Sequence, residues 1–291
     1  MTAPTHASPH PACHPAYLLQ RPFADALPIV VDSPHSGDAM PDDFRPIADG
    51  ARLRGAQDAF VDRLFSGAPA QGAALLAARF PRAYIDPNRA LADIDEDLLD
   101  ERWPGEVAPS EKSRQGMGLV WRLLDGRPLY PRRLSVAQVQ HRIDSCWRPY
   151  HAALRAELDA AHARFGARWH LDVHSMPDDS HRRLGRAGRP LADFVLGDRD
   201  GSTADEATMA VIEHSLRASG FSTARNDPFK GVEIVRASGD PSRRCHAVQL
   251  EVKRSLFMDS ATHRPHGGFA RVQRALERML GALAGHARRE L

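Results

Sequence analysis

Apolar positions along the chain form short runs in some segments and helical stripes in others, and the two patterns predict different elements. Four segments are expected to form strands, at residues 27–32, 169–173, 193–197 and 246–253. In the last of them apolar and polar residues alternate, so Glu251 lies on the face opposite to its apolar neighbours and faces either solvent or a polar site. Residues 72–80 are compatible with a strand or a helix.

Helical periodicity marks five further segments, at residues 57–65, 135–148, 150–165, 204–219 and 267–286. Ser135 and Gln138 match a capping box at the start of the second segment, and Pro149 is expected to break or kink the chain before the third. Because strands and helices are interleaved, we expect an α/β fold in which helices flank a mixed, largely parallel central sheet.

The domain organisation is expected to be simple. Residues 1–20 are rich in Pro, His and Ala without an apolar period and predict a flexible N-terminal tail, and residues 21–291 predict a single α/β domain. Residues 100–133 are rich in Gly, Pro and Arg and predict a long irregular excursion over the surface. Loops of that length in compact domains often have a function.

The charge balance narrows the range of partners. With 39 Lys and Arg against 37 Asp and Glu the net charge is +2, so neither nucleic-acid binding nor membrane-surface binding is expected. The chain contains no apolar run close to the ~20 residues of a membrane span. Its N-terminus lacks the pattern of a secretory signal, so a cytoplasmic protein is expected. Three cysteines without a CxxC motif indicate neither a disulfide framework nor a zinc ribbon.

Two histidines stand where open α/β sheets bind ligands. His35 and His174 each follow the carboxyl end of a predicted strand. Asp58 and Asp62, four residues apart on one face of a predicted helix, are the nearest carboxylates for a third ligand. Two imidazoles and one carboxylate leave a coordination position open, as catalytic zinc sites do.

Further residues suit chemistry beside such a metal. Glu251 can move protons there if its strand face is polar. Asn88 and Arg89 close a rigid Asp-Pro-Asn-Arg turn that presents an amide and a guanidinium together, which fits a substrate carboxylate. The sequence has no glycine-rich phosphate-binding signature and no serine-hydrolase elbow.

Eight short motifs carry a resemblance to a known family. They are Asp32–Gly37 (DSPHSG), Asp58 with Val61-Asp62, Arg79–Arg89 (RFPRAYIDPNR), Trp147–His151 (WRPYH), Asp172–Met176 (DVHSM), Gly197–Gly201 (GDRDG), Asn226–Gly231 (NDPFKG) and Gln249–Glu251 (QLE). From about residue 25 to the C-terminus the chain resembles the N-formylglutamate amidohydrolases, also called N-formylglutamate deformylases. The resemblance implies a phosphorylase/hydrolase-like fold related to the zinc carboxypeptidases and the aspartoacylases.

The implied activity is zinc-dependent hydrolysis of N-formyl-L-glutamate to formate and L-glutamate, the last step of one route of histidine degradation. The resemblance makes His35 and His174 ligands of one Zn²⁺, or of another divalent ion, in each chain. It favours Asp58 as the carboxylate ligand, whereas the ligand spacing of the related carboxypeptidases leaves Asp38 as an alternative. Glu251 takes the position of the catalytic glutamate that acts as general base and acid.

The resemblance also implies how a substrate with two carboxylates is held. Asn88 and Arg89 are similar to the pair that binds the substrate α-carboxylate in carboxypeptidases. The second carboxylate needs another cation, for which the sequence offers Arg82, Arg122, Arg183 and Lys253.

Three alternatives stay open from the sequence. The first is a metal-dependent deacylase of another N-acyl amino acid, with a larger acyl pocket. The second is a non-haem iron oxygenase, because His170 and Asp172 read as HxD and His246 would supply the distal ligand of a facial triad. The third is a non-catalytic binding protein for acidic amino acids. In the zinc interpretation Asp172 instead orients His174 from behind.

Overall fold

An eight-stranded sheet runs through the part of the chain that the computed structural model describes, residues 12–23, 25–186 and 188–291. Across the sheet the strands follow in the order β1 (Ala12–His14), β2 (Tyr17–Gln20), β4 (Ala74–Ala78), β3 (Ile29–Ser33), β7 (Arg168–Met176), β10 (Cys245–Lys253), β8 (Phe194–Gly197) and β9 (Thr223–Arg225). The central strands β4, β3, β7 and β10 are parallel, and β2 and β8 pair with them in the antiparallel sense. The predicted mixed, largely parallel sheet is confirmed.

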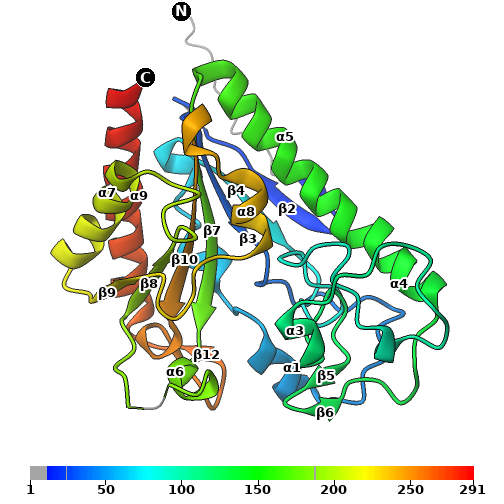
Figure 1. Ribbon diagram of the computed structural model, residues 1–291. Helices are drawn as coiled ribbons and strands as arrows, with labels where there is room; N and C mark the ends of the chain where they lie inside the picture. Colours follow the sequence, from blue (N-terminus) through cyan, green and yellow to red (C-terminus); the bar gives the residue numbers. More distant parts are fainter. Residues whose placement is uncertain (1–11, 24, 187) are drawn as a thin grey trace, which may run out of the picture.

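Helices cover both faces of this sheet (Figure 1). They are α1 (Gly50–Ala56), α2 (Val61–Leu64), α3 (Glu111–Arg114), α4 (Val136–Arg142), α5 (Arg148–Phe165), α6 (Ser180–Arg183), α7 (Glu206–Ala218), α8 (Glu233–Ser238) and α9 (Phe269–Glu290). Helices α7 and α9 pack on one face and the long helix α5 on the other. Each face has its own hydrophobic core. Val31 points into the core under α7 and α9, and its neighbour Val30 points into the core under α5, because successive strand residues face opposite ways.

The remaining elements are short. Two small hairpins pair β5 (Leu123–Leu124) with β6 (Arg127–Pro128) and β11 (Met258–Asp259) with β12 (Arg264–Pro265). The first hairpin and α3 lie within residues 100–133, which otherwise follow the irregular path predicted for them. The ambiguous segment 72–80 forms the buried strand β4.

Two strands at one side of the sheet correct the expected N-terminal tail. Residues Ala12–His14 and Tyr17–Gln20 form β1 and β2, and β2 pairs with β4, so the prediction of a tail is wrong for these residues. Leu19 is buried there. The apolar run of β2 is too short to show a period of its own, and its order comes from pairing with the sheet. Residues 1–11 of the predicted tail lie outside the described residues.

The helix predicted at residues 57–65 is wrong for its first half. Helix α2 begins only at Val61, because Phe60 has a left-handed backbone with φ of 67°. The amide of Asp58 donates to the carbonyl of His35 at 3.0 Å, which holds this stretch as a loop against the turn after β3. Asp58 and Asp62 therefore do not share a helix face.

A π-helical turn at Ile143–Trp147 joins α4 to α5. The capping box of Ser135 and Gln138 starts α4 as predicted. The break expected at Pro149 takes the form of this wider turn, which suits a residue that has no N–H to donate to the preceding turn. The indole N–H of Trp147 donates to the carbonyl of Arg89 at 3.0 Å. The turn thereby joins the long helix to the Asp-Pro-Asn-Arg segment.

The turn after β3 requires a glycine. A Cβ on Gly37 would lie 2.4 Å from the carbonyl carbon of Arg79 and 2.6 Å from the amide nitrogen of Phe80. Both of these atoms are backbone at the end of β4, so neither can rotate away. The absence of a side chain at Gly37 lets the turn that carries His35 lie against the neighbouring strand.

Candidate active site

A cavity of about 1130 Å³ opens where the central parallel strands end. Most of the residues predicted for the site line it: His35, Asp58, Arg82, Asn88, Arg89, His174, Arg183 and Glu251. His35 follows β3 as expected. His174 lies within β7 rather than past its end, because that strand continues to Met176.

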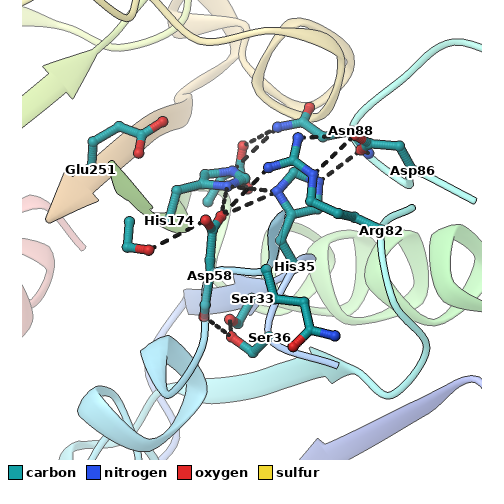
Figure 2. A network of polar contacts seen from close by, with 12 residues as sticks. Ser33, His35, Ser36, Asp58, Arg82, Asp86, Asn88, His174 and Glu251 are labelled. Carbon is teal, nitrogen blue, oxygen red and sulfur yellow. Dashed lines mark hydrogen bonds and ion pairs between the residues drawn. The ribbon is translucent and has the colours of Figure 1, made fainter. Parts of the chain in front are cut away.

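Three donor groups converge in this cavity (Figure 2). The Nδ1 atoms of His35 and His174 lie 3.0 Å apart, and Oδ2 of Asp58 lies 3.3 and 3.1 Å from them. All three residues are buried, and together they are the one group in the described chain whose donor atoms could share an ion. Asp38 is exposed and does not line the cavity, so the geometry favours Asp58 over it.

The chemistry of this donor set fits a divalent metal. Zinc–nitrogen bonds of ~2.0–2.1 Å place the ligands of a tetrahedral site about 3.3 Å apart, close to the separations of the three donors. Each imidazole is bonded behind the site through Nε2, His35 to Asp86 and His174 to Asp172, both at 2.7 Å. With an ion bound, these carboxylates would hold the protons on Nε2 and leave the Nδ1 lone pairs for the ion.

The carboxylate of Asp58 is held ionised and oriented. Burial raises its pKa, but hydrogen bonds with His174 and His35 outweigh that effect and hold the pKa well below its usual range. Arg254, which is buried, donates from Nη2 to Oδ1 of Asp58 at 3.0 Å. This leaves Oδ2 directed at the two histidines.

Glu251 faces the site and not solvent. In the parallel pairing of β10 with β7 it lies opposite His174, so the two side chains leave the sheet on the same face. Gln249 donates from Nε2 to Oε1 of Glu251 at 2.9 Å. Burial raises the pKa of Glu251 to about 7, against the opposing charge of His174, while Asp58 adds to the rise. A carboxyl group with that pKa can gain and lose a proton near neutral pH.

The side-chain amide of Asn88 is hydrogen-bonded to protein groups. Its Nδ2 donates to Oδ2 of Asp172 at 3.2 Å, and its Oδ1 accepts from the amide of Ile234 at 3.0 Å. Asn88 thereby steadies the carboxylate that orients His174. Its predicted contact with a substrate carboxylate stays a prediction.

The predicted cations differ in where they lie. Arg82 lines the cavity, is bonded to Asp86 at 2.9 Å and stands over the ring of Trp121. Arg89 lines it too, with its Nη1 bonded to the carbonyl of Asn88.

The other candidates for the second carboxylate are less well placed. Arg122 and Lys253 do not line the cavity, and they form ion pairs at 2.7 Å with Asp95 and Asp193. The structure therefore does not bring Arg122 to the site. Arg183 lines the cavity, but it is exposed and paired with Asp179 at 2.6 Å.

The facial triad of an iron oxygenase does not form. His170 pairs with Ala247 and His246 pairs with Trp169, so the two histidines leave the sheet on opposite faces. His170 is bonded instead to Asp32 at 2.7 Å. The oxygenase alternative is therefore wrong.

Comparison with known proteins decides the family. The model of the family described as N-formylglutamate amidohydrolase matches residues 27–258. The chain belongs to the N-formylglutamate amidohydrolase family. Its relatives include N-formylglutamate deformylases of Pseudomonas putida and Pseudomonas aeruginosa. Each is 32% identical over 237 residues, which cover 80% of this chain and 82% or 83% of the relative.

Solved structures agree with the membership in this amidohydrolase family. The crystal structure of an N-formylglutamate amidohydrolase from Ralstonia eutropha JMP134 has a TM-score of 0.93 and 47% identity, over 95% of this chain and 99% of that one. A gene product of Agrobacterium tumefaciens shares the fold with a TM-score of 0.66 at 16% identity. The predicted family and its amide-hydrolysing class of enzyme are thus confirmed. In the described residues, helices of the length and apolarity needed to cross a membrane are absent.

Two residues of this amidohydrolase site were not assigned from the sequence. Asp86 orients His35 and binds Arg82, and Arg254 orients Asp58. Asp86 stands in the same motif as Asn88 and Arg89, which was the available signal for it. Arg254 directly follows the strand of Glu251, but its abundant residue type gave no reason to select it.

Proposed function

We propose that this amidohydrolase cleaves N-formyl-L-glutamate into formate and L-glutamate, with Zn²⁺ held by His35, Asp58 and His174. The observation that carries the proposal is the strand register that sets Glu251 beside these three donors. Relatives named N-formylglutamate deformylase support the choice of substrate. A metal site next to a carboxyl group that titrates near neutral pH suits the hydrolysis of an amide.

Glu251 moves the protons of the proposed reaction. A divalent ion at the three donors would lower the pKa of a water molecule and polarise the formyl carbonyl. A carboxylate oxygen of Glu251 accepts a proton as the water oxygen bonds to the formyl carbon. As the carbon–nitrogen bond breaks, Glu251 returns the proton to the departing nitrogen, which gives formate and the amine of glutamate.

Arg82 is placed to stabilise the negative charge that develops on the formyl oxygen. Its Nη1 lies 3.9 Å from Oδ2 of Asp58, at the edge of the donor cluster. The bond to Asp86 and the contact with the ring of Trp121 hold the guanidinium in place before any substrate arrives. A cation fixed in advance stabilises an oxyanion without reorganisation during the reaction.

The substrate is proposed to be held by its carboxylates, with Arg89 and Asn88 at the α-carboxylate. The formyl group is small, so discrimination between substrates has to come from the glutamate portion. The proposal includes one metal ion per chain, a single catalytic domain that takes in β1 and β2 as well as residues 21–291, and a role in histidine degradation in the cytoplasm.

Formate release by the zinc-loaded protein tests the proposal. N-formyl-L-glutamate, N-acetyl-L-glutamate and N-formyl-L-aspartate are supplied in parallel, with and without a chelator. We expect rapid, chelator-sensitive release of formate from the first substrate. Bound zinc at one ion per chain without formate release would overturn the choice of substrate, and acetate release would support the deacylase of another N-acyl amino acid. A protein that binds no zinc would remove the ligand assignment.

A further inference from the structure

One cation in the cavity wall has no carboxylate partner. In the part of the chain that the structure describes, eight lysine and arginine side chains line the cavity, and seven of them form an ion pair with Asp or Glu. The eighth is Lys112. Its Nζ lies 3.5 Å from Oε1 of Gln115, a neutral group at the limit of a hydrogen bond. In the described chain the ammonium of Lys112 therefore has no carboxylate at ion-pair distance, and the exposed Glu111 acts on it only from farther away.

The surroundings of Lys112 favour an anion. Its side chain is half-buried, and this burial, followed by the charges of Arg89 and Arg82, lowers its pKa. Arg82 and Arg89 are themselves balanced by Asp86 and Asp93. Among the described cations of the cavity wall, Lys112 is thus the one without a carboxylate at ion-pair distance, and a bound carboxylate would supply that partner.

The backbone of Lys112 is fixed relative to Arg89. Asp93 accepts hydrogen bonds from the amide and the hydroxyl of Ser110 at 2.6 and 2.9 Å, and it lies 3.7 Å from Nε of Arg89. The amide of Met117 donates to the carbonyl of Lys112 at 2.8 Å, and Nε of Arg89 donates to the carbonyl of Met117 at 3.3 Å. The backbone that carries Lys112 and the guanidinium of Arg89 therefore belong to one bonded unit, which suits a ligand with two anionic groups.

We propose that Lys112 binds the side-chain carboxylate of the substrate and selects acidic over neutral amino-acid substrates, an inference that rests on the proposed function. Arg89 would hold the α-carboxylate of the same molecule. The other cations considered for this role are engaged elsewhere. Arg122 and Lys253 lie outside the cavity wall, and Arg183 is exposed and paired with Asp179.

Binding of L-glutamate and L-glutamine tests this assignment, because the two are close in shape and the side-chain carboxylate of the first is replaced by a neutral amide in the second. Calorimetric titrations use the zinc-loaded wild type, K112M, K112R and K230M. Lys230 is the matched control, since it lines the same cavity but is paired with Asp200 at 2.7 Å. We expect the wild type to bind L-glutamate at least about 10-fold more tightly than L-glutamine. In K112M this preference falls by about 10-fold, K112R keeps part of it, and K230M keeps all of it.

Turnover gives a second readout that separates this inference from the proposed function. The ratio of kcat/KM for N-formyl-L-glutamate to that for N-formyl-L-glutamine should fall in K112M in the same proportion, mainly through KM. A K112M that binds L-glutamate with the wild-type preference overturns the inference, as does an equal loss in K230M, even if the wild type releases formate. If the wild type releases no formate but K112M still loses the preference, the acidic subsite stands and the proposed substrate fails.

Discussion

The side chains of Glu251 and Gln249 lie on the same face of β10, and the amide of Gln249 donates a hydrogen bond to the carboxyl group of Glu251. Both lie beside the cluster of His35, Asp58 and His174. In the proposed mechanism the carboxyl group of Glu251 carries out both proton transfers. A substitution that keeps the shape of Glu251 but removes its acid–base capacity therefore separates binding from catalysis.

E251Q is expected to lower kcat by about 10² to 10⁴-fold, the usual contribution of a general acid and base. The metal ligands are untouched, so the zinc content should stay at the wild-type level. Steady-state formate release and metal analysis of the same preparation check both expectations. Wild-type turnover in E251Q would remove Glu251 from the mechanism, and a loss of zinc would mean that its role is structural.

Arg254 is expected to affect the metal through Asp58. R254M removes the charged donor to Oδ1 of Asp58 and leaves the bond from the hydroxyl of Ser175 at 3.3 Å. Zinc binding should weaken by about 10- to 100-fold, the usual effect of losing a residue that orients a ligand. Competition with a chromogenic chelator measures the affinity. R182M is the control, because Arg182 lines the same cavity but is exposed and paired with Asp179. An equal change in both variants would contradict a specific role for Arg254.

At the residue scale, site residues that stand in short motifs could be predicted from the sequence, as for His35, His174 and Glu251. Arg254 and Lys112 could not. Arg254 is one of many arginines, so its residue type does not single it out. Lys112 stands out only because the neighbouring cations have carboxylate partners and it has none, which is decided by the folded structure.

At the scale of elements, the turn after β3 limits what the chain tolerates. G37A should destabilise the fold by about 1–3 kcal/mol or more, because its Cβ meets the backbone of Arg79 and Phe80. Formate release should fall as His35 is displaced. Chemical denaturation measures the stability. G267A is the control, since a Cβ there meets nothing within 4 Å. A stable, active G37A would show that the turn can shift.

Elements whose own sequence has a clear hydrophobic pattern were predicted. Elements that depend on pairing or contacts with other segments were not. The stripes of α7 and α9 reflect burial on one side of each helix. The alternation of β10 separates an apolar face from the polar face of Gln249 and Glu251, although both faces are buried. The strand β2 exists because β4 offers it hydrogen bonds. The start of α2 was misplaced because the left-handed Phe60 depends on contacts with the turn after β3.

At the scale of the whole molecule, the proposed metal ligands come from distant parts of the chain. His35, Asp58 and His174 meet only in the folded state, so a bound ion stabilises that state alone. At a free zinc concentration of about 100 Kd the gain is ~2.7 kcal/mol, or a rise in Tm of roughly 5 °C or more. Calorimetric scans with zinc and with a chelator measure it. In D58A the shift should shrink, and an undiminished shift would place the ion elsewhere.

The register between strands is the part of the site that no local pattern determines. Glu251 lies opposite His174 because β10 and β7 align over their full length, from Cys245 opposite Arg168 to Lys253 opposite Met176. A shift by one residue would turn Glu251 to the other face of the sheet. The alternation of the strand predicted two possible faces for Glu251, and only the assembled sheet chooses between them.

The π-helical turn at Ile143–Trp147 bears on how relatives of this chain are aligned. It accommodates one residue more than an α-helical turn, and each residue of an α-helix advances by about 100°. A sequence with a one-residue gap in this segment would therefore rotate α4 against α5. Tyr150 would leave the sheet or Trp147 would leave the carbonyl of Arg89. In a relative, such a gap would indicate that the Asp-Pro-Asn-Arg segment beside the cavity is held by different contacts.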